Sequence, residues 1–336
     1  MTGPTALRAR VTSFGGPEVL ALERFTPPER PRRKVRVRVT HASVGSTDAM
    51  ARAGDYLLQP RPGFVPGYDF VGVLETTDAA AERRGLLPGT RVTGCLPRMG
   101  GYTSQLDVPS ARLVAVPDGI DSAHAAALPL DLVTAALAVD LADPPSGATI
   151  FVQGVSGAVG ALITQSVTAD GMRVIGTASD RTRGLAESLG ADVVDYRDPT
   201  WPQHVRKLAP EGTDAAVDHT GSPLVRSVVN RKGTVVRTAW SGRSGHGRSD
   251  AALGGLVANI RRYARPRERL CSVPLVVALQ PGKYRKFLYD QLNRVADGGL
   301  RGPTVTTVPF GDVVDAHRAL ATLAPGHKLV LEMDAG

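Results

Sequence analysis

The alternation of short apolar runs with helical patterns, which begins near residue 148, most strongly constrains what this chain can fold into. Short apolar strands separated by helices pair in parallel through right-handed crossovers, which gives a doubly wound sheet. We therefore predict an α/β fold for this part of the chain. The expected strands are residues 148–153, 172–177, 192–196, 214–218 and 234–238, and the first helices between them are residues 157–169 and 181–190.

A glycine-rich turn joins the first of these strands to its helix. Gly154, Gly157 and Gly160 follow the spacing GxxGxxG. Glycines let the backbone approach a pyrophosphate, and the helix N-terminus supplies N–H groups and a positive dipole. The turn therefore predicts a dinucleotide site, although a strand-to-helix turn without a ligand is the alternative that the spacing leaves open. The other residues expected at this site are Ser156, Ala158 and Val159.

The end of the second strand indicates which dinucleotide binds. NAD sites usually place an acidic residue here, about 20 residues beyond the glycine turn, but this chain has Ala178. Ser179, Arg181 and Arg183 follow and could bind a 2′-phosphate by hydrogen bond and charge. Asp180 argues in the other direction, and a solvated helical turn is the alternative reading of the arginines. We therefore predict NADPH as the cofactor.

The first third of the chain has a different pattern. Residues 34–40 alternate apolar and charged side chains, the period of a half-buried strand. Frequent Gly and Pro predict a small β-barrel with tight turns. Asp121 is a candidate N-cap for one helix that runs to about residue 142. Much later in the chain, the Gly- and Ser-rich residues 241–250 predict a loop.

Composition narrows the class of protein. The 336 residues hold only two cysteines, Cys95 and Cys271, which excludes a disulfide framework and a Cys-rich zinc module. No apolar run approaches the roughly 18–20 residues of a membrane helix, and the N-terminus lacks the apolar region of a signal peptide. We therefore expect a cytoplasmic protein without a membrane partner. The net charge of +8 could attract phosphorylated cofactors or acidic proteins, but without a nucleic-acid-binding signature we do not expect nucleic acid as a partner.

Further motifs follow one another in order along the chain. They are residues 13–20 (SFGGPEVL), 66–73 (PGYDFVGV), 126–129 (AALP), 154–160 (GVSGAVG), 190–192 (GAD) and 328–330 (KLV). This ordered set covers about residues 8–334 and resembles the zinc-free quinone oxidoreductase (zeta-crystallin-like) branch of the medium-chain dehydrogenase/reductase superfamily.

The resemblance implies a specific architecture and activity. A GroES-like β-barrel catalytic domain, residues 1–124 and 270–336, would surround an inserted Rossmann NADP(H)-binding domain, residues 125–269. The active site would lie in the cleft between them, where NADPH would deliver a hydride to a quinone, an enone or an enoyl thioester. Such proteins are commonly homodimers joined through strands of the cofactor domain, and residues 270–278 could supply that edge.

The resemblance also assigns cofactor contacts, residue by residue. Ser179, Arg181 and Tyr196 match positions that hold the adenosine 2′-phosphate. Thr134 matches a threonine that contacts the cofactor, and Gly221 falls where the loop after the fourth strand meets the nicotinamide half. Lys328 belongs to the last motif and is included among the expected cofactor contacts.

Catalytic candidates follow from the comparison with zinc-dependent relatives, which carry Cys at Gly45 and His-Glu at Tyr68-Asp69. No metal is therefore expected. Tyr68 would face the reacting carbon and could donate a proton, Thr47 aligns with a relay hydroxyl, and Tyr56 lies in a loop that lines the substrate mouth. Solvent is the alternative proton source. Asp48 and Asp69 are expected to bond backbone donors.

The substrate stays open at this point. Gly45 and Ala136 replace a larger Asn and an aromatic residue of the family, which implies a roomier pocket. A specialised pathway reductase, such as a trans-acting enoyl or ketone reductase of polyketide-type biosynthesis, is therefore the first alternative, and a non-catalytic NADPH-binding protein is the second. The run from Arg261 to Arg269 has five Arg and one Glu. It is either a solvated surface or a dock for an acidic carrier protein or a CoA phosphate.

Overall fold

The computed structural model describes residues 5–240 and 245–333. The chain divides into two compact units. The split unit joins the segment that ends at Val133 with the segment that begins at Val273, and the inserted unit is Thr134–Ser272. The chain therefore leaves the split unit and later returns to it. The domain limits at 124/125 and 269/270 stay a prediction.

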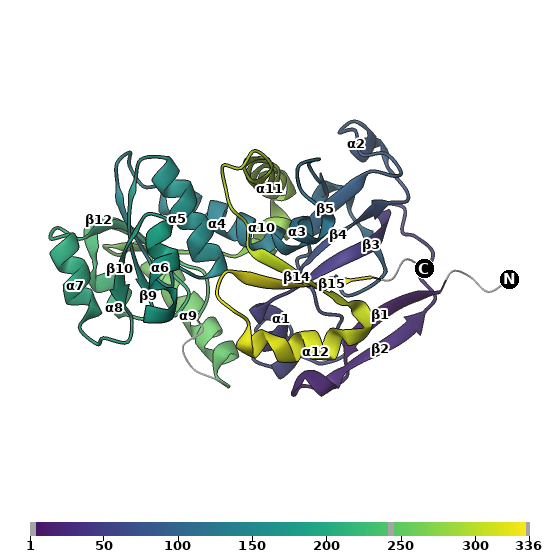
Figure 1. Ribbon diagram of the computed structural model, residues 1–336, viewed down its shortest axis with the longest axis horizontal. Helices are drawn as coiled ribbons and strands as arrows, with labels where there is room; N and C mark the ends of the chain where they lie inside the picture. The colour runs from purple at the N-terminus through teal and green to yellow at the C-terminus, as the bar shows by residue number, and fades with distance from the viewer. Residues whose placement is uncertain (1–4, 241–244, 334–336) are drawn as a thin grey trace. The chain divides into compact units, whose positions relative to one another are not determined.

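A seven-stranded sheet forms the centre of the split unit (Figure 1). Val35, Val37 and Val39 are buried and Arg38 is exposed, so the expected two-residue period is present. Neighbours pair antiparallel, except that β14 and β15 are parallel. The strands across the sheet are β14 (Thr304–Pro309), β15 (His327–Glu332), β3 (Val35–Val44), β4 (Asp69–Leu74), β5 (Arg91–Cys95) and β7 (Val114–Ala115), with β6 (Gln105–Val108) on β3; β1 (Ala6–Val11) and β2 (Leu20–Phe25) form a separate pair.

The hydrophobic core of the split unit draws on both of its chain segments. Phe70 and Leu113 come from the first segment, and Phe310 and Leu331 come from the second. All four side chains are almost fully buried in one cluster. Because burial of apolar area is the main stabilising term in folding, neither segment could complete this core alone.

The single helix expected between Asp121 and residue 142 is two helices. Asp121 caps α3 (Ser122–Ala127) and accepts the backbone N–H of His124 at 2.9 Å, as predicted. Pro129 has no N–H with which to continue that helix, so it begins α4 (Pro129–Ala142) instead. The split unit ends within α4, at Val133, so most of α4 belongs to the inserted unit. Besides α3, the helices of the split unit are α1 (Ser46–Ala53), α2 (Ala79–Glu82), α10 (Val273–Leu279), α11 (Pro281–Ala296) and α12 (Val313–Ala319).

The inserted unit is the doubly wound sheet that the alternation predicted. All six strands are parallel, and their order is that of a dinucleotide-binding sheet, 3-2-1-4-5-6 in chain order within the unit. The strands across the sheet are β10 (Ala191–Asp195), β9 (Arg173–Ala178), β8 (Thr149–Val152), β11 (Thr213–Asp218), β12 (Val229–Arg237) and β13 (Arg267–Leu270). The helices are α5 (Ala158–Ala169), α6 (Asp180–Ser188), α7 (Trp201–Leu208), α8 (Leu224–Ser227) and α9 (Gly247–Arg261).

Two sequence predictions in the last third of the chain are wrong. Positions 241–244 of the expected loop lie outside the described residues, but residues 247–250 begin α9 rather than extend a loop. Asp250 in the first turn complements the helix dipole. The expected dimer edge at residues 270–278 is not a strand either, because β13 ends at Leu270 and α10 follows. Pro274 in the first turn of α10 suits a helix start and could not donate to a strand ladder.

No helix within residues 5–240 and 245–333 combines the length and the apolar character needed to cross a bilayer.

Candidate functional site

The glycine turn of the inserted unit needs glycine for backbone reasons. Gly154 has a φ of 71°, in the left-handed region that favours glycine. A Cβ on Gly160 would lie 2.3 Å from the Gly154 carbonyl oxygen, so α5 packs this close only because Gly160 has none. Gly157 caps α5 without a side-chain hydrogen bond, which leaves the helix N-terminus open to an anion. The turn therefore fits a pyrophosphate, and Ser156, Ala158 and Val159 complete it.

The turn lies at the switch point of the sheet, where β8 and β11 are neighbours. Ligands of open α/β sheets bind in the crevice outside the carboxyl ends of the strands at this point. His219 follows β11, and its Cε1 is 2.8 Å from the position of a Cβ added to Gly154. The loop after β11 is therefore in contact with the glycine turn.

The carboxyl ends of β9 and β10 bring together the residues expected at an adenosine 2′-phosphate. Ala178 and Asp195 are register partners on these strands, so Ser179 and Tyr196 follow at adjacent positions of one edge. Ser179 is the N-cap of α6, and Arg181 on that helix is exposed. Tyr196 is half-exposed. This edge carries an acidic residue in NAD sites. Here it carries the Ser179 hydroxyl and the exposed Arg181 guanidinium instead.

The neighbouring charges are engaged within the protein. Arg197 pairs with both Asp180 and Asp195, and its hydrogen bonds lower the pKa of Asp195 to about 2. The charge of Asp180 is thereby compensated. Arg183 donates to the carbonyl of Val193 at 2.9 Å, which directs its guanidinium toward the protein. Of the two expected arginines, Arg181 is therefore the one whose guanidinium is better placed to bind a 2′-phosphate.

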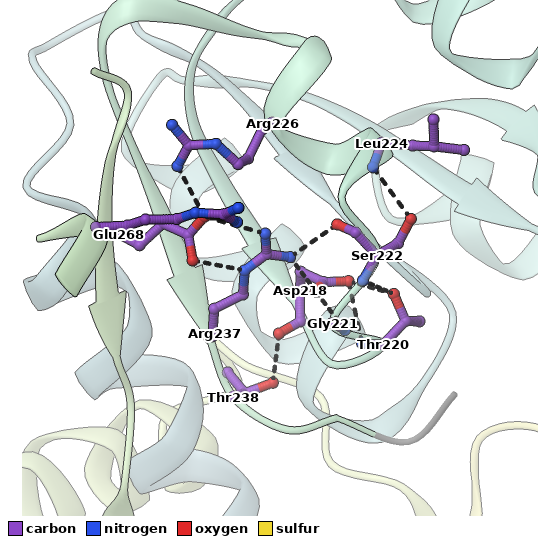
Figure 2. A network of polar contacts seen from close by, with 10 residues as sticks. Asp218, Thr220, Gly221, Ser222, Leu224, Arg226, Arg237, Thr238 and Glu268 are labelled. Atoms are coloured by element: carbon purple, nitrogen blue, oxygen red, sulfur yellow. Dashed lines mark hydrogen bonds and ion pairs between the residues drawn. The ribbon is translucent and has the colours of Figure 1, made fainter. Parts of the chain in front are cut away.

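The loop after β11 is held by one buried carboxylate. Asp218 accepts the N–H groups of Thr220 at 3.0 Å and Gly221 at 2.8 Å, and the hydroxyl of Thr220 at 2.7 Å (Figure 2). Gly221 has a φ of 76°, and a Cβ there would meet the Trp240 indole at 2.3 Å. A cavity of about 480 Å³ lies beside this loop. Its lining includes Gly221, Trp240, Arg237, Arg261 and Glu268.

Sequence reasoning included Gly221 but missed the charged residues around it. Asp218, Arg237 and Glu268 lie on three adjacent strands and are all at most 2% exposed. Strands of a parallel sheet usually read as continuous apolar runs. A charged residue at the end of such a run, as in Val235-Val236-Arg237, was the signal that could have identified them.

Two tyrosines of the split unit form a hydroxyl pair. The oxygens of Tyr56 and Tyr68 are 2.7 Å apart, and their rings meet edge to face at 6.3 Å. Burial raises the pKa of Tyr56 to about 12 and also raises the pKa of Tyr68. Both hydroxyls therefore stay protonated at neutral pH. One proton joins the two oxygens, and the second can be donated to another acceptor.

Thr47 does not belong to this pair of hydrogen-bonded hydroxyls. It is half-buried on α1, and the described residues show no hydrogen bond between it and either tyrosine. The two nearby carboxylates are structural, as expected. Asp48 accepts the N–H groups of Gly45 and Gly67, each at 2.9 Å, and Asp69 accepts that of Leu130 at 3.0 Å. Burial raises the pKa of Asp48 to about 6 and of Asp69 to about 7.

The two remaining predicted cofactor contacts lie in different surroundings. Lys328 on β15 is buried and donates to the carbonyl of Ala127 at 2.7 Å and to Asp131 at 2.6 Å. Thr134 is half-buried on α4. Its carbonyl faces the thiol of Cys271 at 3.9 Å. A cofactor contact stays a prediction at both positions.

Within the described ranges, residues 5–240 and 245–333, no group of three or more His, Cys, Asp or Glu side chains is placed to hold a metal ion. At the positions of the zinc ligands of the zinc-dependent relatives, Gly45 offers no donor and the Tyr68 hydroxyl is already bonded to Tyr56.

Comparison with protein families gives two matches. A family described as "Alcohol dehydrogenase GroES-like domain" matches residues 31–118, and one described as "Zinc-binding dehydrogenase" matches residues 158–257. A quinone oxidoreductase of Pseudomonas aeruginosa is 32% identical over 206 residues, which are 60% of this chain and 62% of that protein. A quinone oxidoreductase of Lama guanicoe is 30% identical over 224 residues, 65% of this chain and 67% of that protein. The match thus spans less than two-thirds of the bacterial relative.

Solved structures share the fold over nearly the whole chain. A quinone oxidoreductase from Coxiella burnetii has a TM-score of 0.80 at 21% identity and covers 98% of this chain and 100% of its own. The JamJ enoyl reductase has a TM-score of 0.84 at 18% identity, with 98% and 99% covered. At these identities the likeness establishes the architecture alone, a GroES-like unit with an inserted Rossmann unit.

Proposed function

The chain belongs to the medium-chain dehydrogenase/reductase superfamily, among the quinone oxidoreductases, and on that premise we propose that it is a zinc-independent, NADPH-dependent reductase of conjugated carbonyl compounds. The observation that carries the proposal is the carboxyl edge of the inserted sheet. There a glycine turn fits a pyrophosphate, and the next strand ends in Ala178 and Ser179 rather than in an acid.

NADPH is the cofactor that this edge favours. Its 2′-phosphate needs hydrogen-bond donors and positive charge, which Ser179, Arg181 and Tyr196 offer at adjacent positions. Arg197 compensates Asp180, the one acid that would repel the phosphate. When bound, NADPH would supply the hydride.

The acid–base work falls to the tyrosine pair. Hydride addition to a conjugated carbonyl places negative charge on the carbonyl oxygen, which a hydrogen-bond donor stabilises. Tyr68 is only 2% exposed and Tyr56 is half-buried. We therefore propose that the more exposed hydroxyl, that of Tyr56, donates a hydrogen bond to the carbonyl oxygen of the substrate. The Tyr68 hydroxyl would orient the Tyr56 hydroxyl through the bond between them. Thr47 stays a proposed relay hydroxyl.

We propose a cytoplasmic location for this enzyme. Cys95 and Cys271 are buried free thiols, which suits a reducing compartment.

Zinc independence rests on side-chain chemistry. A catalytic zinc needs three protein ligands and an open position. Gly45 and Tyr68 replace two ligands of the zinc-dependent relatives, and neither is a usual zinc donor. Chelator treatment of the purified protein should therefore leave its activity unchanged. Loss of activity that only zinc restores would contradict this part of the proposal.

The first experiment is NADPH oxidation by the purified protein, measured as loss of NADPH absorbance, against quinones, enones, ketones and enoyl thioesters. NADH serves as the control cofactor. Turnover of simple quinones or enones with NADPH is the expected result. NADPH binding without turnover of any acceptor would instead support a non-catalytic binding protein.

A specialised pathway reductase is the second candidate, and one observation favours it. Among the described residues, a Cβ on Gly45 would have only Asp48 Oδ2 within 4 Å, at 3.5 Å, so packing would admit a larger residue that the chain does not have. The space left there suits a bulky acceptor. Activity restricted to bulky or carrier-linked substrates within the same panel would identify this function.

An acidic carrier protein could present such a substrate at the run from Arg261 to Arg269. Arg262, Arg265 and Arg267 are exposed there, whereas Arg261 is paired with Glu268. We propose that charge reversal at Arg262 and Arg265 weakens turnover of carrier-linked substrates and spares free ones. Equal effects on both substrate types would exclude the dock.

We also propose that the protein is a homodimer. β13 ends the six-stranded sheet in the part of the chain that the structure describes, so its outer edge can pair with the same edge of a second copy. Sedimentation of the full chain tests the oligomeric state.

A further inference from the structure

A buried ion network joins the last three strands of the inserted sheet. Asp218 ends β11 and Arg237 ends β12, directly opposite each other in the register. Arg237 Nη1 donates to Asp218 Oδ2 at 2.6 Å. On its other side the guanidinium faces both carboxylate oxygens of Glu268 on β13, at 3.3 and 3.4 Å. One arginine therefore connects β11, β12 and β13.

The same arginine also bonds the loop after β11. Arg237 Nη1 donates to the carbonyl of Ser222 at 3.0 Å (Figure 2). Asp218, held by Arg237, accepts the backbone N–H groups of Thr220 and Gly221. Each residue from 220 to 222 is thus bonded either to Arg237 or to the carboxylate that Arg237 holds. Arg237 therefore supports the loop both directly, at Ser222, and through Asp218.

The loop forms one side of the switch-point crevice. His219, at its start, contacts Gly154 of the glycine turn. Strand order places the loop on the β11 side of that turn and Ser179 and Tyr196 on the β9 and β10 side. A dinucleotide across the switch point would therefore have its nicotinamide half at the loop and its adenosine half at Ser179.

We infer that Arg237 is a positioning residue, which fixes the 220–222 loop for the nicotinamide half of NADPH through Asp218 and the Ser222 carbonyl. This inference rests on the proposed function, because it takes NADPH as the ligand. It predicts that loss of Arg237 weakens binding of the nicotinamide half of NADPH, because residues 220–222 are no longer held in place. The contacts of the adenosine half should stay intact.

The chain supplies a matched control. Arg226 donates to Glu268 Oε1 at 2.7 Å, so it shares one carboxylate with Arg237. Within the described residues, the hydrogen bonds that Arg226 donates go to Glu268 and to the carbonyl of Pro223, and none goes to residues 220–222. Arg226→Gln therefore removes an ion pair from the same network and leaves the loop anchor intact. Arg237→Lys keeps the charge but loses the planar fork that bonds three partners at once.

The experiment measures binding of NADPH and of 2′,5′-ADP, which represents the adenosine half alone, by calorimetry on the full chain. Arg237→Lys and Arg237→Gln should raise the Kd of NADPH about tenfold, as expected for loss of a charge-assisted bond of roughly 1.4 kcal/mol. They should leave the Kd of 2′,5′-ADP within about twofold, and Arg226→Gln should change neither. Thr220→Val, which removes the bond from the Thr220 hydroxyl to Asp218 and the bond that this hydroxyl accepts from the Ser222 N–H, should show the same selectivity more weakly.

The outcomes separate this inference from the proposed function. Equal weakening of NADPH and 2′,5′-ADP in the Arg237 variants would overturn the positioning role, because general damage to the unit would explain it. Unchanged NADPH binding in Arg237→Lys and Thr220→Val would overturn it as well. Failure of the unaltered protein to bind NADPH would instead overturn the proposed function before any variant is compared.

Discussion

At the residue scale, the proposed preference for NADPH over NADH rests mainly on Arg181. Its guanidinium is exposed beside Ser179 at the edge where a 2′-phosphate would lie. Arg181→Ala should therefore raise the Kd of NADPH about tenfold and leave that of NADH nearly unchanged, since NADH lacks the phosphate. Calorimetry with both cofactors measures the ratio of the affinity for NADPH to the affinity for NADH, which should fall about tenfold in this variant.

Arg183 provides the control for this prediction. It lies two residues further along α6, but its guanidinium bonds the carbonyl of Val193. Arg183→Ala should therefore leave the ratio of the two affinities unchanged. If the ratio falls with Arg183→Ala and not with Arg181→Ala, the assignment of the phosphate site to Arg181 is wrong.

The two tyrosine hydroxyls should contribute unequally to the rate. Tyr56→Phe removes the outer donor and should lower kcat about 100-fold with a smaller change in KM, in the lower range for a positioned acid. Tyr68→Phe removes only the orienting hydroxyl and should lower kcat about tenfold. Tyr289→Phe, at an exposed tyrosine of α11, is the control and should be neutral. A full rate in both Tyr56→Phe and Tyr68→Phe would leave solvent as the proton source.

At the element scale, the sequence was informative wherever a feature is local. The glycine turn, the parallel strands and the Asp121 cap are set by residues close together in the chain, and the structure confirms them. α9 was missed because Gly and Ser dominate residues 241–250, whereas the helix is stabilised by packing. Gly254 lies against the Trp240 indole, where a Cβ would be 2.0 Å from its Nε1.

Contacts between distant segments were beyond sequence reasoning. The tyrosine pair joins residues twelve apart, and both tyrosines were found only because the resemblance placed each near the substrate. Arg237 and Glu268 are 31 residues apart, and no resemblance pointed to them. Their pairing depends on β12 and β13 becoming neighbours in the sheet, which a charge pattern along the chain does not reveal.

The packing of α12 on the split unit should make stability depend on pH. His317 on α12 is buried, with its Nε2 3.3 Å from the Tyr102 hydroxyl. Burial, with a smaller effect of the Arg52 charge, lowers the pKa of His317 from 6.5 to about 4. The unfolded chain then binds more protons than the folded chain between these values, so stability is lost as pH falls from about 6.5 to 4. The shift of about 2.5 units corresponds to roughly 3 kcal/mol.

Chemical unfolding of the protein and of His317→Gln at several pH values measures this loss. The buried carboxyl of Asp48 titrates in the opposite sense, because its raised pKa of about 6 stabilises the folded state as pH falls. That contribution is present in both proteins and cancels in their difference. The stability advantage of the unaltered protein should therefore shrink by about 3 kcal/mol from pH 7 to pH 4. A constant difference would show that His317 does not titrate in this range.

At the scale of the whole molecule, a net charge of +8 and a pI near 9.8 should make the affinity for a polyanionic cofactor depend on salt. Screening shortens the reach of surface charge to about 8 Å at physiological ionic strength. The Kd of NADPH should therefore rise about fivefold between roughly 20 and 300 mM salt. The KM of an uncharged quinone should not change.

The slope of this dependence also separates a cofactor enzyme from a nucleic-acid-binding protein. At the proposed site NADPH would meet few charged groups, so the slope of log Kd against log salt should stay at about 0.6, the value of a fivefold change over this salt range, and become smaller in Arg181→Ala. A nucleic acid that releases many counterions would give a much steeper slope, about 0.9 for each phosphate contacted. We expect short duplex DNA to compete with NADPH only at the lowest salt. Tight DNA binding at physiological salt, with a steep slope, would show that the basic surface serves nucleic acid.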